Sequence, residues 1–596
     1  MTMPDVKPPP DAAADASGEP DLFTPHADPM PSETLRRVDG DKGVSLAERV
    51  TAGLHRLGYR SALHRIRLRG RFPLKLLAVP VDPIPGDVAA GERILRGRLL
   101  YAGYNAPART AHFADPQAPA AWRDWAHSFV WLRDLAAAAD RPAGAAVAEP
   151  LVALWLADHH DFDGVAWRPD LLALRLMSWT AYAPYILSSP DLVYRSAVLN
   201  ALARWGRHLD RAIDRVPDGP ARVTAASGLI VAALIIPGVE ARLVRAEGLL
   251  ERALDAVVLP DGGTADRSPM TQLRLLEHLL FLQASYAARG RKPAAVVVAG
   301  FERLVPALKS IVMGDGGVGA WHGGGAVRPA RIDHAVARSG IMPRPSRSTS
   351  FAGYQRLAAG KTLIVVDAAP PPQARAADAA HAGTLAFELS DGTNRLVVNC
   401  GGRSPGAPLP PELAAALRTT AAHSTLVLAD SNSTRIRPDG ALGKGVEEVI
   451  VNRQESEEGI WLDLAHDGYV RRFGVIHRRR LFLSANGGDL RGEDLIEPVP
   501  GRRLRRRGAR AGFDVRFHLG PGIEVTPTAD GQAALLKLAD GRVWQVRARG
   551  GALTVDDSVW IDPDGVPRTT RQLVISGTTT AAGAASVNWS FKRAGL

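Results

Sequence analysis

Two histidines and one asparagine stand at the ends of three short apolar segments of this chain. His381 precedes the segment TLAFELS, Asn399 falls near the end of RLVVNC, and His423 opens STLVLA. Imidazole nitrogens serve as general bases near neutral pH and, together with oxygen ligands, bind metals. These residue types predict a catalytic or metal-binding cluster, provided that the fold brings the three side chains together. The alternative is that each is a separately hydrogen-bonded turn residue.

The elements that would bring them together are β-strands. Residues 384–389 and 395–400 are rich in apolar residues, and the Asp391-Gly392 pair between them is a strong hairpin signal. From residue 351 to the C-terminus, short segments with a period of two recur between Gly, Asp and Asn turns. This pattern predicts an antiparallel β-sandwich domain over residues 345–596.

Helical periodicity dominates the N-terminal half. Trp122, Trp125 and Leu132 share one face of a predicted helix, and later helical segments of similar length end at Pro or Gly. Repeated helices joined by short loops are typical of a bundle or of an α/α toroid. We predict a toroid-like helical domain over residues 46–335, preceded by a disordered tail over residues 1–45 that is rich in Pro, Ala and Asp. The predicted fold class is α+β multidomain.

Charge and cysteine content narrow the range of partners. The chain has a net charge of +11 and a pI near 10.0, and its cations are mainly arginines, which suit carboxylate, sulfate or phosphate groups. This favours an acidic polysaccharide as partner, although GC-rich coding is an alternative source of the arginine. No known DNA- or RNA-binding motif accompanies the charge, so no nucleic-acid partner is expected. The single cysteine, Cys400, excludes an internal disulfide and a cysteine-based zinc motif.

Targeting signals are not evident in the sequence. The N-terminal segment MTMPDVKPPPDAAADASGEP lacks the basic and apolar regions of a secretory signal peptide. The longest apolar run, residues 228–236, is too short to span a bilayer. We expect a cytoplasmic protein without a transmembrane segment, and the periplasm is the alternative location. The sequence makes no prediction of the oligomeric state.

Five short motifs, in one order, connect the chain with a known family. They are RSPMTQLRLLEHL after PDGGTAD, HAGTLAFELS, RLVVNCGG, TAAHSTLVL and HDGYVRRFGVIHRRRLFLS. In these motifs the sequence resembles the heparinase II/III-like polysaccharide lyases. The resemblance implies an N-terminal α/α toroid, a C-terminal β-sandwich and a substrate cleft between them. It also implies β-elimination on polysaccharides that contain uronic acid, such as glycosaminoglycans.

β-Elimination makes three chemical demands. The uronate carboxylate must be neutralised, a base must remove the C5 proton, and an acid must protonate the departing glycosidic oxygen. Family members carry a catalytic Tyr followed by His after the Ser-Pro of the first motif, where this chain has Thr271-Gln272. They carry an Asn-His pair on the preceding helices, where this chain has Ala226-Ser227. Two catalytic positions of the family are therefore substituted.

The positions in the C-terminal half are better retained. His381 matches a family histidine that acts on the substrate or belongs to a metal site, and His423 matches the other motif histidine. Asn399 falls where metal-binding members carry Asp. The resemblance thus implies one structural zinc ion held by His381, Asn399 and His423.

Three residues are candidates for the catalytic roles. His381 is the candidate base. Arg267, beside the position of the missing Tyr, is a candidate for neutralising the carboxylate; an ordinary ion pair with Asp266 or Glu277 is the alternative. Tyr469 is a candidate proton donor from the sandwich side, and the alternative is a half-buried sheet tyrosine.

Aromatic and polar loop residues predict a substrate-binding surface. His159, Trp167 and Arg168 flank one loop, and Trp321 and His322 lie in the glycine-rich segment MGDGGVGAWHGGGAVRP. Mobile loops with such residues often line substrate clefts. The alternatives are a helix-terminal histidine at 159, favoured by the helix dipole, and a plain interdomain connector at 313–329.

Three functions agree with these features. The first is a polysaccharide lyase-like protein that acts by β-elimination on an acidic polysaccharide. The second is a non-catalytic acidic-polysaccharide-binding protein of the cell envelope, which the substituted Tyr and Asn-His positions favour. The third is a glycoside hydrolase that uses Asp261 and Asp266 of the helical domain as its carboxyl pair.

Overall fold

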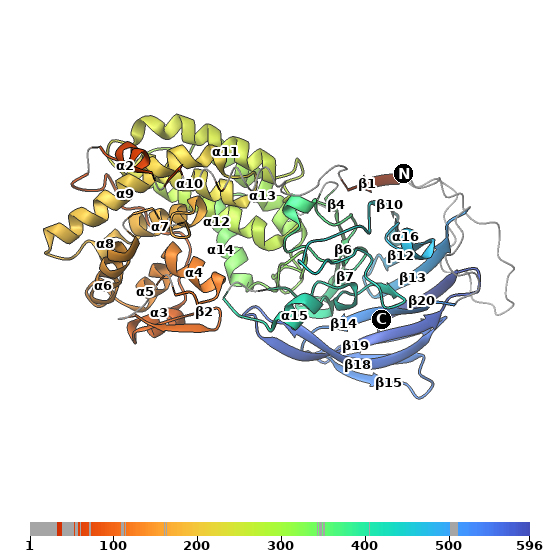
Figure 1. Ribbon diagram of the computed structural model, residues 1–596. Helices are drawn as coiled ribbons and strands as arrows, with labels where there is room; N and C mark the ends of the chain where they lie inside the picture. Colours follow the sequence, from red (N-terminus) through yellow and green to blue (C-terminus); the bar gives the residue numbers. More distant parts are fainter. Residues whose placement is uncertain are drawn as a thin grey trace.

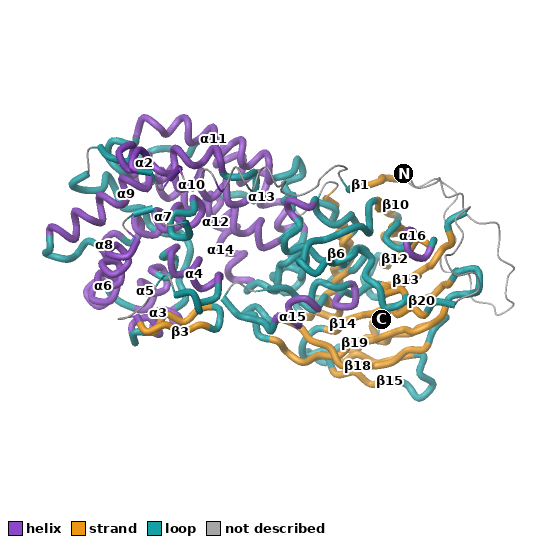
Figure 2. Tube along the Cα trace, in the orientation of Figure 1, coloured by secondary structure: helices purple, strands orange, loops and turns teal. Residues whose placement is uncertain are grey.

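The chain folds as a helical domain followed by an antiparallel β-sandwich domain (Figure 1, Figure 2). The last helix of the first domain ends at Ser339, and the strands of the second begin at Ser348. The predicted fold class is confirmed. This computed structural model describes residues 32–37, 53, 58–59, 61–70, 73–108, 113, 115–159, 161–162, 164–342, 344, 348–349, 352–403, 406–500 and 510–595.

Helices of the N-terminal domain begin at signals that the sequence carries. Pro169, Pro220, Pro269 and Pro329 each occupy the first position of a helix, where the missing N–H costs no hydrogen bond. The helices are α2 (Ala62–Arg67), α3 (Val88–Leu95), α4 (Ala120–Ser128), α5 (Leu132–Ala138), α6 (Arg141–His159), α7 (Pro169–Ala181), α8 (Ala183–Ile186), α9 (Leu192–Ala212), α10 (Pro220–Ile235), α11 (Leu243–Val257), α12 (Pro269–Ala288), α13 (Ala295–Ser310) and α14 (Pro329–Ser339).

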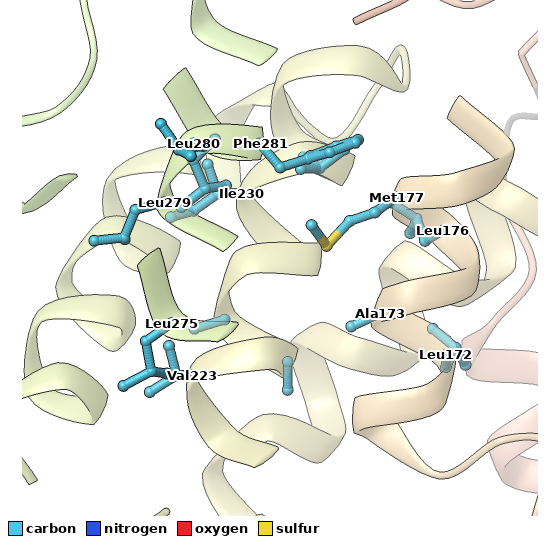
Figure 3. Close-up of a cluster of buried hydrophobic side chains, with 14 of the residues drawn as sticks. Leu172, Ala173, Leu176, Met177, Val223, Ile230, Leu275, Leu279, Leu280 and Phe281 are labelled. Carbon is cyan, nitrogen blue, oxygen red and sulfur yellow. The ribbon is translucent and has the colours of Figure 1, made fainter. Parts of the chain in front are cut away.

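Helix α10 forms the centre of this domain. Its residues 223–235 are all buried, and it packs against α7, α9, α11 and α12. Gly228 permits the close approach to α7, because a Cβ at this position would lie 2.5 Å from the Cβ of Ala173. Met177 of α7, Ile230 of α10 and Phe281 of α12 belong to the shared apolar core (Figure 3). Burial of each such side chain stabilises the fold by roughly 1.5–3 kcal/mol.

A short hairpin, β2 (Arg98–Tyr101) and β3 (Tyr104–Pro107), is inserted in the helical domain. Its turn residues Ala102 and Gly103 have φ values of 48° and 73°, as a type I′ turn requires. The backbone N–H of Ala102 donates to the carbonyl of Gly406 at 3.1 Å. The tip of the hairpin therefore touches the sandwich domain.

Two large antiparallel sheets form the sandwich. Their strands, with two short helices, are β1 (Ser32–Arg36), β4 (Ser348–Thr349), β5 (Tyr354–Ala359), β6 (Thr362–Asp367), β7 (Phe387–Asp391), β8 (Asn394–Val398), α15 (Pro411–Ala416), β9 (Leu426–Leu428), β10 (Glu448–Glu455), β11 (Gly459–His466), α16 (Val470–Phe473), β12 (Val475–Ser484), β13 (Asp489–Pro498), β14 (Gly512–Leu519), β15 (Glu524–Pro527), β16 (Ala533–Lys537), β17 (Val543–Arg549), β18 (Ala552–Ile561), β19 (Pro567–Thr578) and β20 (Ala585–Arg593). One sheet has the order β1-β10-β11-β12-β13-β20-β17-β16-β15; the other has the order β18-β19-β14-β8-β7-β6-β5-β4, and β9 pairs with β14.

The predicted hairpin around residue 392 is confirmed. Strands β7 and β8 pair in antiparallel fashion, and Asp391 lies opposite Asn394. Gly392 has a φ of 57°, a value that glycine adopts without strain. The hairpin lies in the sheet beside β14, and α15 and the residues before β9 follow it along the chain.

The predicted disordered tail is wrong for one segment. Residues 32–36 form β1, which pairs with β10 at the edge of the first sheet, from Ser32 opposite Asn452 to Arg36 opposite Glu448. Leu35 packs against the apolar core of the sandwich, which a composition-based prediction does not detect. The rest of the predicted tail apart from Arg37, and most of residues 46–60 of the predicted helical domain, lie outside the described residues.

The two domains share an apolar interface. Tyr354, Val365 and Ala386 of the sandwich belong to the same buried cluster as the helical core, whereas the space between the sheets has its own cluster. Helices α13 and α14 lie on the side of the helical domain that faces the sandwich (Figure 1), and α13 contacts β4. Within the described part of the chain, no helix combines the length and apolarity that crossing a membrane requires.

Candidate functional site

A cleft with a volume of about 1310 Å³ lies between the two domains. The helical domain contributes most of its wall, from α4, α7, α10, α12 and α14 and from the β2–β3 hairpin. The sandwich contributes Gly402, Arg403 and Gly406 from the loop after β8, and residues 561–564 from the end of β18 and the turn that follows it. A cleft of this size can hold several sugar units.

Helix α12 presents one face to the cleft. Met270, Thr271, Arg274, His278 and Phe281 line it, at intervals of three and four residues that place them on one side of a helix. The opposite side of α12 is apolar and buried in the helical core, through Leu273, Leu276, Leu279, Leu280 and Leu282. The packing of that side fixes which residues face the cleft.

Arg274 is a cleft cation that forms no ion pair with a described residue. Within the described part of the chain, it has no hydrogen bond or ion pair with another residue, and its side chain is exposed. Partial desolvation by the cleft walls, and then the charge of the neighbouring Arg331, lower the pKa of Arg274. A guanidinium that is open to the cleft and has no ion-pair partner favours an anion that arrives from solution.

His278 lies one turn further along α12. The hydroxyl of Thr224 donates to the carbonyl of Pro220 at 3.0 Å, so it accepts from Nε2 of His278 at 3.0 Å. This leaves the lone pair of a neutral ring on Nδ1. Burial, with a smaller contribution from Arg274, outweighs the opposing charge of Glu277 and lowers the pKa of His278 to about 4. His278 is therefore a neutral imidazole at physiological pH.

Tyr101 and Trp125 form an aromatic pair in the cleft wall. Their rings are parallel, with an interplanar angle of 1° and centroids 4.9 Å apart. Burial raises the pKa of the Tyr101 hydroxyl, and Arg274 opposes this rise. The phenol is therefore protonated near neutral pH, and it lies close enough to Arg274 for the charge of the guanidinium to affect its pKa.

Of the residues predicted from sequence to bind or act on substrate, only Arg168 lines the cleft. Its guanidinium pairs with Asp124 at 2.9 Å and with Asp170 at 2.7 Å. Trp167 is buried and donates its indole N–H to the carbonyl of His159 at 3.2 Å. His159 is buried as well, so the predictions that these two residues touch substrate are wrong.

Arg267 is a structural residue, and its predicted role as carboxylate neutraliser is wrong. It adopts a left-handed conformation with a φ of 55° and inserts its guanidinium into the sandwich. All five of its N–H hydrogens have acceptors there. The acceptors are the carbonyls of Ala352 (2.6 Å), Ala369 (3.2 Å), Pro370 (3.0 Å) and Gly353 (3.3 Å), and Oδ1 of Asp367 (2.5 Å).

The glycine-rich loop is held by the same interface. His322 is buried, its Nε2 lies 3.3 Å from Oδ2 of Asp367, and its Nδ1 accepts the backbone N–H of His381 at 3.4 Å. Trp321 is buried against the ring of Tyr354. Neither side chain lines the cleft, so both predictions of substrate contact are wrong. The loop reaches the cleft further on, at residues 325–328.

His381 and His423 do lie together, as the sequence suggested. Nε2 of His381 accepts the backbone N–H of Gly323 at 3.0 Å, so the neutral ring carries its proton on Nδ1. That proton is donated to Nε2 of His423 at 3.0 Å, and Nδ1 of His423 donates to the carbonyl of Thr419 at 2.7 Å. Burial lowers the pKa of both rings, that of His423 to about 4. The buried His381 cannot reach substrate, so its predicted role as base is wrong.

Asn399 is an amide for a local reason. Its Oδ1 accepts the N–H of Ser424 at 3.0 Å, and its Nδ2 donates to the carbonyl of Ala320 at 3.4 Å and to the carboxylate of Glu388 at 3.3 Å. An aspartate could not donate these bonds and would face the Glu388 carboxylate. The amide therefore fits these surroundings better than an aspartate would.

The predicted zinc ligands do not fit a zinc ion. Each ring nitrogen of His381 and His423 already has a hydrogen-bond partner, and the Asn399 oxygen is bound to Ser424. Zinc requires lone pairs that point at the metal. Among the residues with described positions, no group of three or more His, Cys, Asp or Glu side chains could hold a metal ion.

Removal of metal should leave the protein unchanged, because neutral histidines and not an ion hold the loop. Protein purified without added metal should contain no stoichiometric zinc by elemental analysis, and a chelator should not shift the thermal unfolding midpoint. A structural zinc contributes roughly 10 kcal/mol or more to folding, so its removal would be obvious. One zinc per chain, with a lower midpoint in chelator, would show that the ring tautomers are assigned wrongly.

Tyr469 cannot serve as a proton donor to substrate. It is buried between the sheets, where its hydroxyl donates to the carbonyl of Leu426 at 2.9 Å. Burial raises the pKa of this hydroxyl. The predicted role as proton donor is wrong because Tyr469 is part of the sandwich core. The alternative, a half-buried sheet tyrosine, is closer to the structure, in which the side chain is fully buried.

The carboxyl pair of the glycoside hydrolase hypothesis is not in the cleft either. Asp261 accepts the backbone N–H of Gly263 at 2.9 Å and that of Ala352 at 2.9 Å. Asp266 accepts the hydroxyl of Thr271 at 2.5 Å. Neither carboxylate lines the cleft, so this hypothesis is not carried further.

Sequence reasoning missed four residues of the cleft, namely Tyr101, Trp125, Arg274 and His278. A signal for two of them exists, since positions 274 and 278 follow Thr271 at helical spacing and therefore share its face. Trp125 was assigned to a helix face but not to a cleft. Nothing in the sequence around Tyr101 marks it as a site residue.

Comparisons with known proteins place the chain in a family. A family model described as heparinase II/III-like, C-terminal, matches residues 341–590. FtsZ-localized protein C of Caulobacter vibrioides is 32% identical over 547 residues, which cover 90% of this chain and 93% of that protein.

Two solved structures have the same architecture. Heparinase III is 12% identical, with a TM-score of 0.65, and the match covers 94% of this chain and 93% of that one. A mutant of the heparan sulfate lyase HepC from Pedobacter heparinus is 14% identical, with a TM-score of 0.58, and the match covers 92% and 90%. These structural likenesses show the fold. Together with the family model and the relative of high coverage, they show that the chain belongs to the heparinase II/III-like family.

Proposed function

We propose that the chain is a polysaccharide lyase-like protein that acts by β-elimination on a uronic-acid-containing polysaccharide bound in the interdomain cleft. The observation that carries this proposal is Arg274, a cleft cation with no hydrogen bond or ion pair to a described residue, flanked by a neutral histidine and a protonated tyrosine. These are the three kinds of group that β-elimination requires.

Each group has one role in the proposed mechanism. Arg274 binds the uronate carboxylate and stabilises the negative charge that develops when the C5–H bond breaks. His278 accepts the C5 proton on Nδ1. Tyr101 donates its proton to the glycosidic oxygen as the C4–O bond breaks and a C4–C5 double bond forms. Thr271, at the position of the family's Tyr, is engaged with Asp266 and takes no part.

Arg274→Gln should lower kcat/KM on a uronate polymer by roughly 100-fold, because one charge-stabilising contact of this kind is worth about 2.7–4 kcal/mol in the transition state. The ultraviolet absorbance of the unsaturated uronate product measures the rate. Arg328→Gln is the matched control, because Arg328 also lines the cleft but is exposed and paired with Asp564. It should retain most of the activity.

The assay also separates the two polysaccharide hypotheses. No absorbance change with any of a panel of uronate polymers would count against a lyase. Saturable binding without turnover, weakened by Arg274→Gln, would instead support the non-catalytic binding protein. The absence of both would remove the polysaccharide function altogether.

A second candidate function comes from the similarity to FtsZ-localized protein C. FtsZ-localized protein C is 32% identical over nearly the whole chain, and the family's catalytic Tyr and Asn-His positions are substituted here. We propose as the alternative that this chain associates with FtsZ and retains the lyase fold as a scaffold. Co-sedimentation with FtsZ filaments tests it; protein that stays in the supernatant at all filament concentrations would exclude direct association.

A further inference from the structure

The charges that line the cleft are not those of a groove for a dense polyanion. Among the described lining residues, eight are carboxylates and six are arginines, a formal excess of two negative charges. The whole chain has a net charge of +11. Most of the basic excess therefore lies outside the cleft, and the cleft itself has no positive field to attract a polyanion.

Ion pairs neutralise most of the cleft arginines. Four of the six have a carboxylate partner within the cleft wall, in pairs that satisfy both charges. The pairs are Arg133 with Asp82 (2.8 Å), Arg168 with Asp124 (2.9 Å) and Asp170 (2.7 Å), Arg331 with Glu277 (2.7 Å), and Arg328 with Asp564.

The other carboxylates of the cleft are also engaged. Asp87 accepts the N–H of Ala90 at the start of α3, and Asp134 accepts the N–H of Asp87. Asp562 pairs with Arg568 at 2.8 Å. Burial raises the pKa of Asp134 to about 6, so this group is partly protonated in mildly acidic solution. Each of these carboxylates would have to give up an existing hydrogen bond or ion pair to bind a cationic group of a ligand.

Two arginines remain for a ligand. Among the arginines that line the cleft, Arg274 on α12 and Arg403 in the loop after β8 have no hydrogen bond or ion pair with another described residue. They come from different domains. A bound chain can therefore place one carboxylate on each, and any further anionic group would meet arginines that are already neutralised.

Much of the remaining wall is apolar. Tyr101 and Trp125 stack on one another, which holds both rings in fixed positions. The aliphatic and aromatic side chains beside them are Leu171, Leu174, Met177, Met270, Leu275 and Phe281. Such surfaces suit the C–H faces of neutral or N-acetylated sugars, and they give no compensation to a desolvated sulfate.

We infer that the cleft selects unsulfated polysaccharides in which uronates alternate with neutral or N-acetylated sugars, and that it discriminates against heavily sulfated chains. The inference rests on the proposed function of the cleft in polysaccharide binding. Each sulfate beyond the two available cations loses its water and gains no positive partner, and it approaches carboxylates whose charges are already balanced. Discrimination follows from the ion pairs and not from the shape of the wall.

Binding of size-matched oligosaccharides to the full chain tests this inference. Fluorescence anisotropy would compare labelled decasaccharides of hyaluronan, N-acetylheparosan and heparin. The two unsulfated chains should bind at least about 10-fold more tightly than heparin, and their affinity should fall with salt with a logarithmic slope of about one to two, as expected for one or two ionic contacts. Arg274→Gln should weaken hyaluronan binding about 10-fold, whereas Arg328→Gln should change it less than about 2-fold.

A gain of function provides a second, independent test. Asp124→Asn combined with Asp170→Asn would free the exposed guanidinium of Arg168 while keeping side chains of the same size. This double variant should bind heparin about 10-fold more tightly than the original chain, because a third cation becomes available. Its affinity for hyaluronan should rise less than its affinity for heparin, because hyaluronan carries one carboxylate per disaccharide and no sulfate.

The outcomes distinguish this inference from the proposed function on which it rests. Heparin that binds more tightly than hyaluronan, and that loses affinity in Arg274→Gln, would overturn the selection for unsulfated chains and leave polysaccharide binding in the cleft intact. Binding of none of the three oligosaccharides, or binding that Arg274→Gln does not affect, would overturn both. Circular dichroism of each variant, with the helical signal unchanged, establishes that the altered affinity is not caused by unfolding.

Discussion

Replacing Arg267 by methionine should lower the free energy of unfolding by about 3–5 kcal/mol, the usual result when one partner of a buried ion pair is removed. Arg267 and Asp367 have side chains that are 5% and 1% exposed, and they belong to different domains. Methionine fills a similar space but donates no hydrogen bond. It would leave the buried Asp367 carboxylate without its cation and would remove the guanidinium donors of the Ala352 and Pro370 carbonyls.

The pKa of Asp367 explains why the removal of Arg267 should destabilise the fold. Burial opposes its ionisation, but Arg267 and then His322 outweigh burial and hold the pKa of Asp367 below its usual value. Without Arg267, burial is opposed by His322 alone, and the carboxyl should take up a proton near neutral pH. Asp367→Asn in the Arg267→Met background should therefore recover part of the lost stability, because the amide carries no charge to compensate.

Equilibrium unfolding in urea, followed by tryptophan fluorescence and by far-ultraviolet circular dichroism, measures the change. Two probes are needed because a two-domain chain need not unfold in one step. Arg328→Gln again serves as control: it breaks an exposed interdomain ion pair, which should cost less than about 1 kcal/mol. A loss below about 1 kcal/mol for Arg267→Met would show that the guanidinium site is open to water.

The contrast between Arg267 and Arg274 explains what sequence reasoning could and could not predict. The fold followed from patterns along the chain, such as the period of two after residue 351, the Asp391-Gly392 turn and the prolines at helix starts. These are local signals. Which of two arginines, seven positions apart, faces substrate depends on packing between domains. Arg267 precedes α12 in a left-handed conformation and enters the sandwich, whereas Arg274 sits on the cleft face of the helix.

The histidine cluster shows the same limit in another form. The strands brought His381 and His423 within hydrogen-bond distance, as the alternation of residues suggested. Residue type alone did not reveal that both rings are buried, or that Gly323 and Thr419 occupy their outer nitrogens. Those partners are backbone groups, which carry no sequence signature. The predicted cluster therefore exists as a structural clamp on the glycine-rich loop.

Acid should destabilise the protein between pH 7 and pH 5 by at least about 4 kcal/mol, because two buried histidines must stay neutral in the folded state. Burial lowers the pKa of His208 to about 3, and it lowers that of His518 to about 3. An unfolded histidine has a pKa near 6.5. Below that value the unfolded chain binds protons that the folded chain excludes, so the free energy of unfolding falls as the pH falls.

The surroundings of the two rings support this direction. His208 lies against Trp167 and Phe162, and its neighbours His64, Arg211 and Arg175 oppose its protonation. His518 donates from Nε2 to the carbonyl of Ala421 at 2.9 Å, and His423 and Arg516 oppose its protonation. At pH 5 each ring accounts for a loss of about 2 kcal/mol, since one pKa unit corresponds to about 1.4 kcal/mol.

His518→Gln separates this effect from general acid denaturation. Glutamine can retain a donor toward the Ala421 carbonyl but does not titrate, so the loss of stability between pH 7 and pH 5 should be about 2 kcal/mol smaller than in the original chain. Arg328→Gln, which introduces no group that titrates in this range, should show the original pH dependence. Urea unfolding at half-unit pH steps measures, for each variant, how steeply the free energy of unfolding changes with pH. A His518→Gln variant with the same slope as the original chain would mean that the His518 ring takes up its proton as readily in the folded protein as in the unfolded chain, and that burial at this position does not keep it neutral.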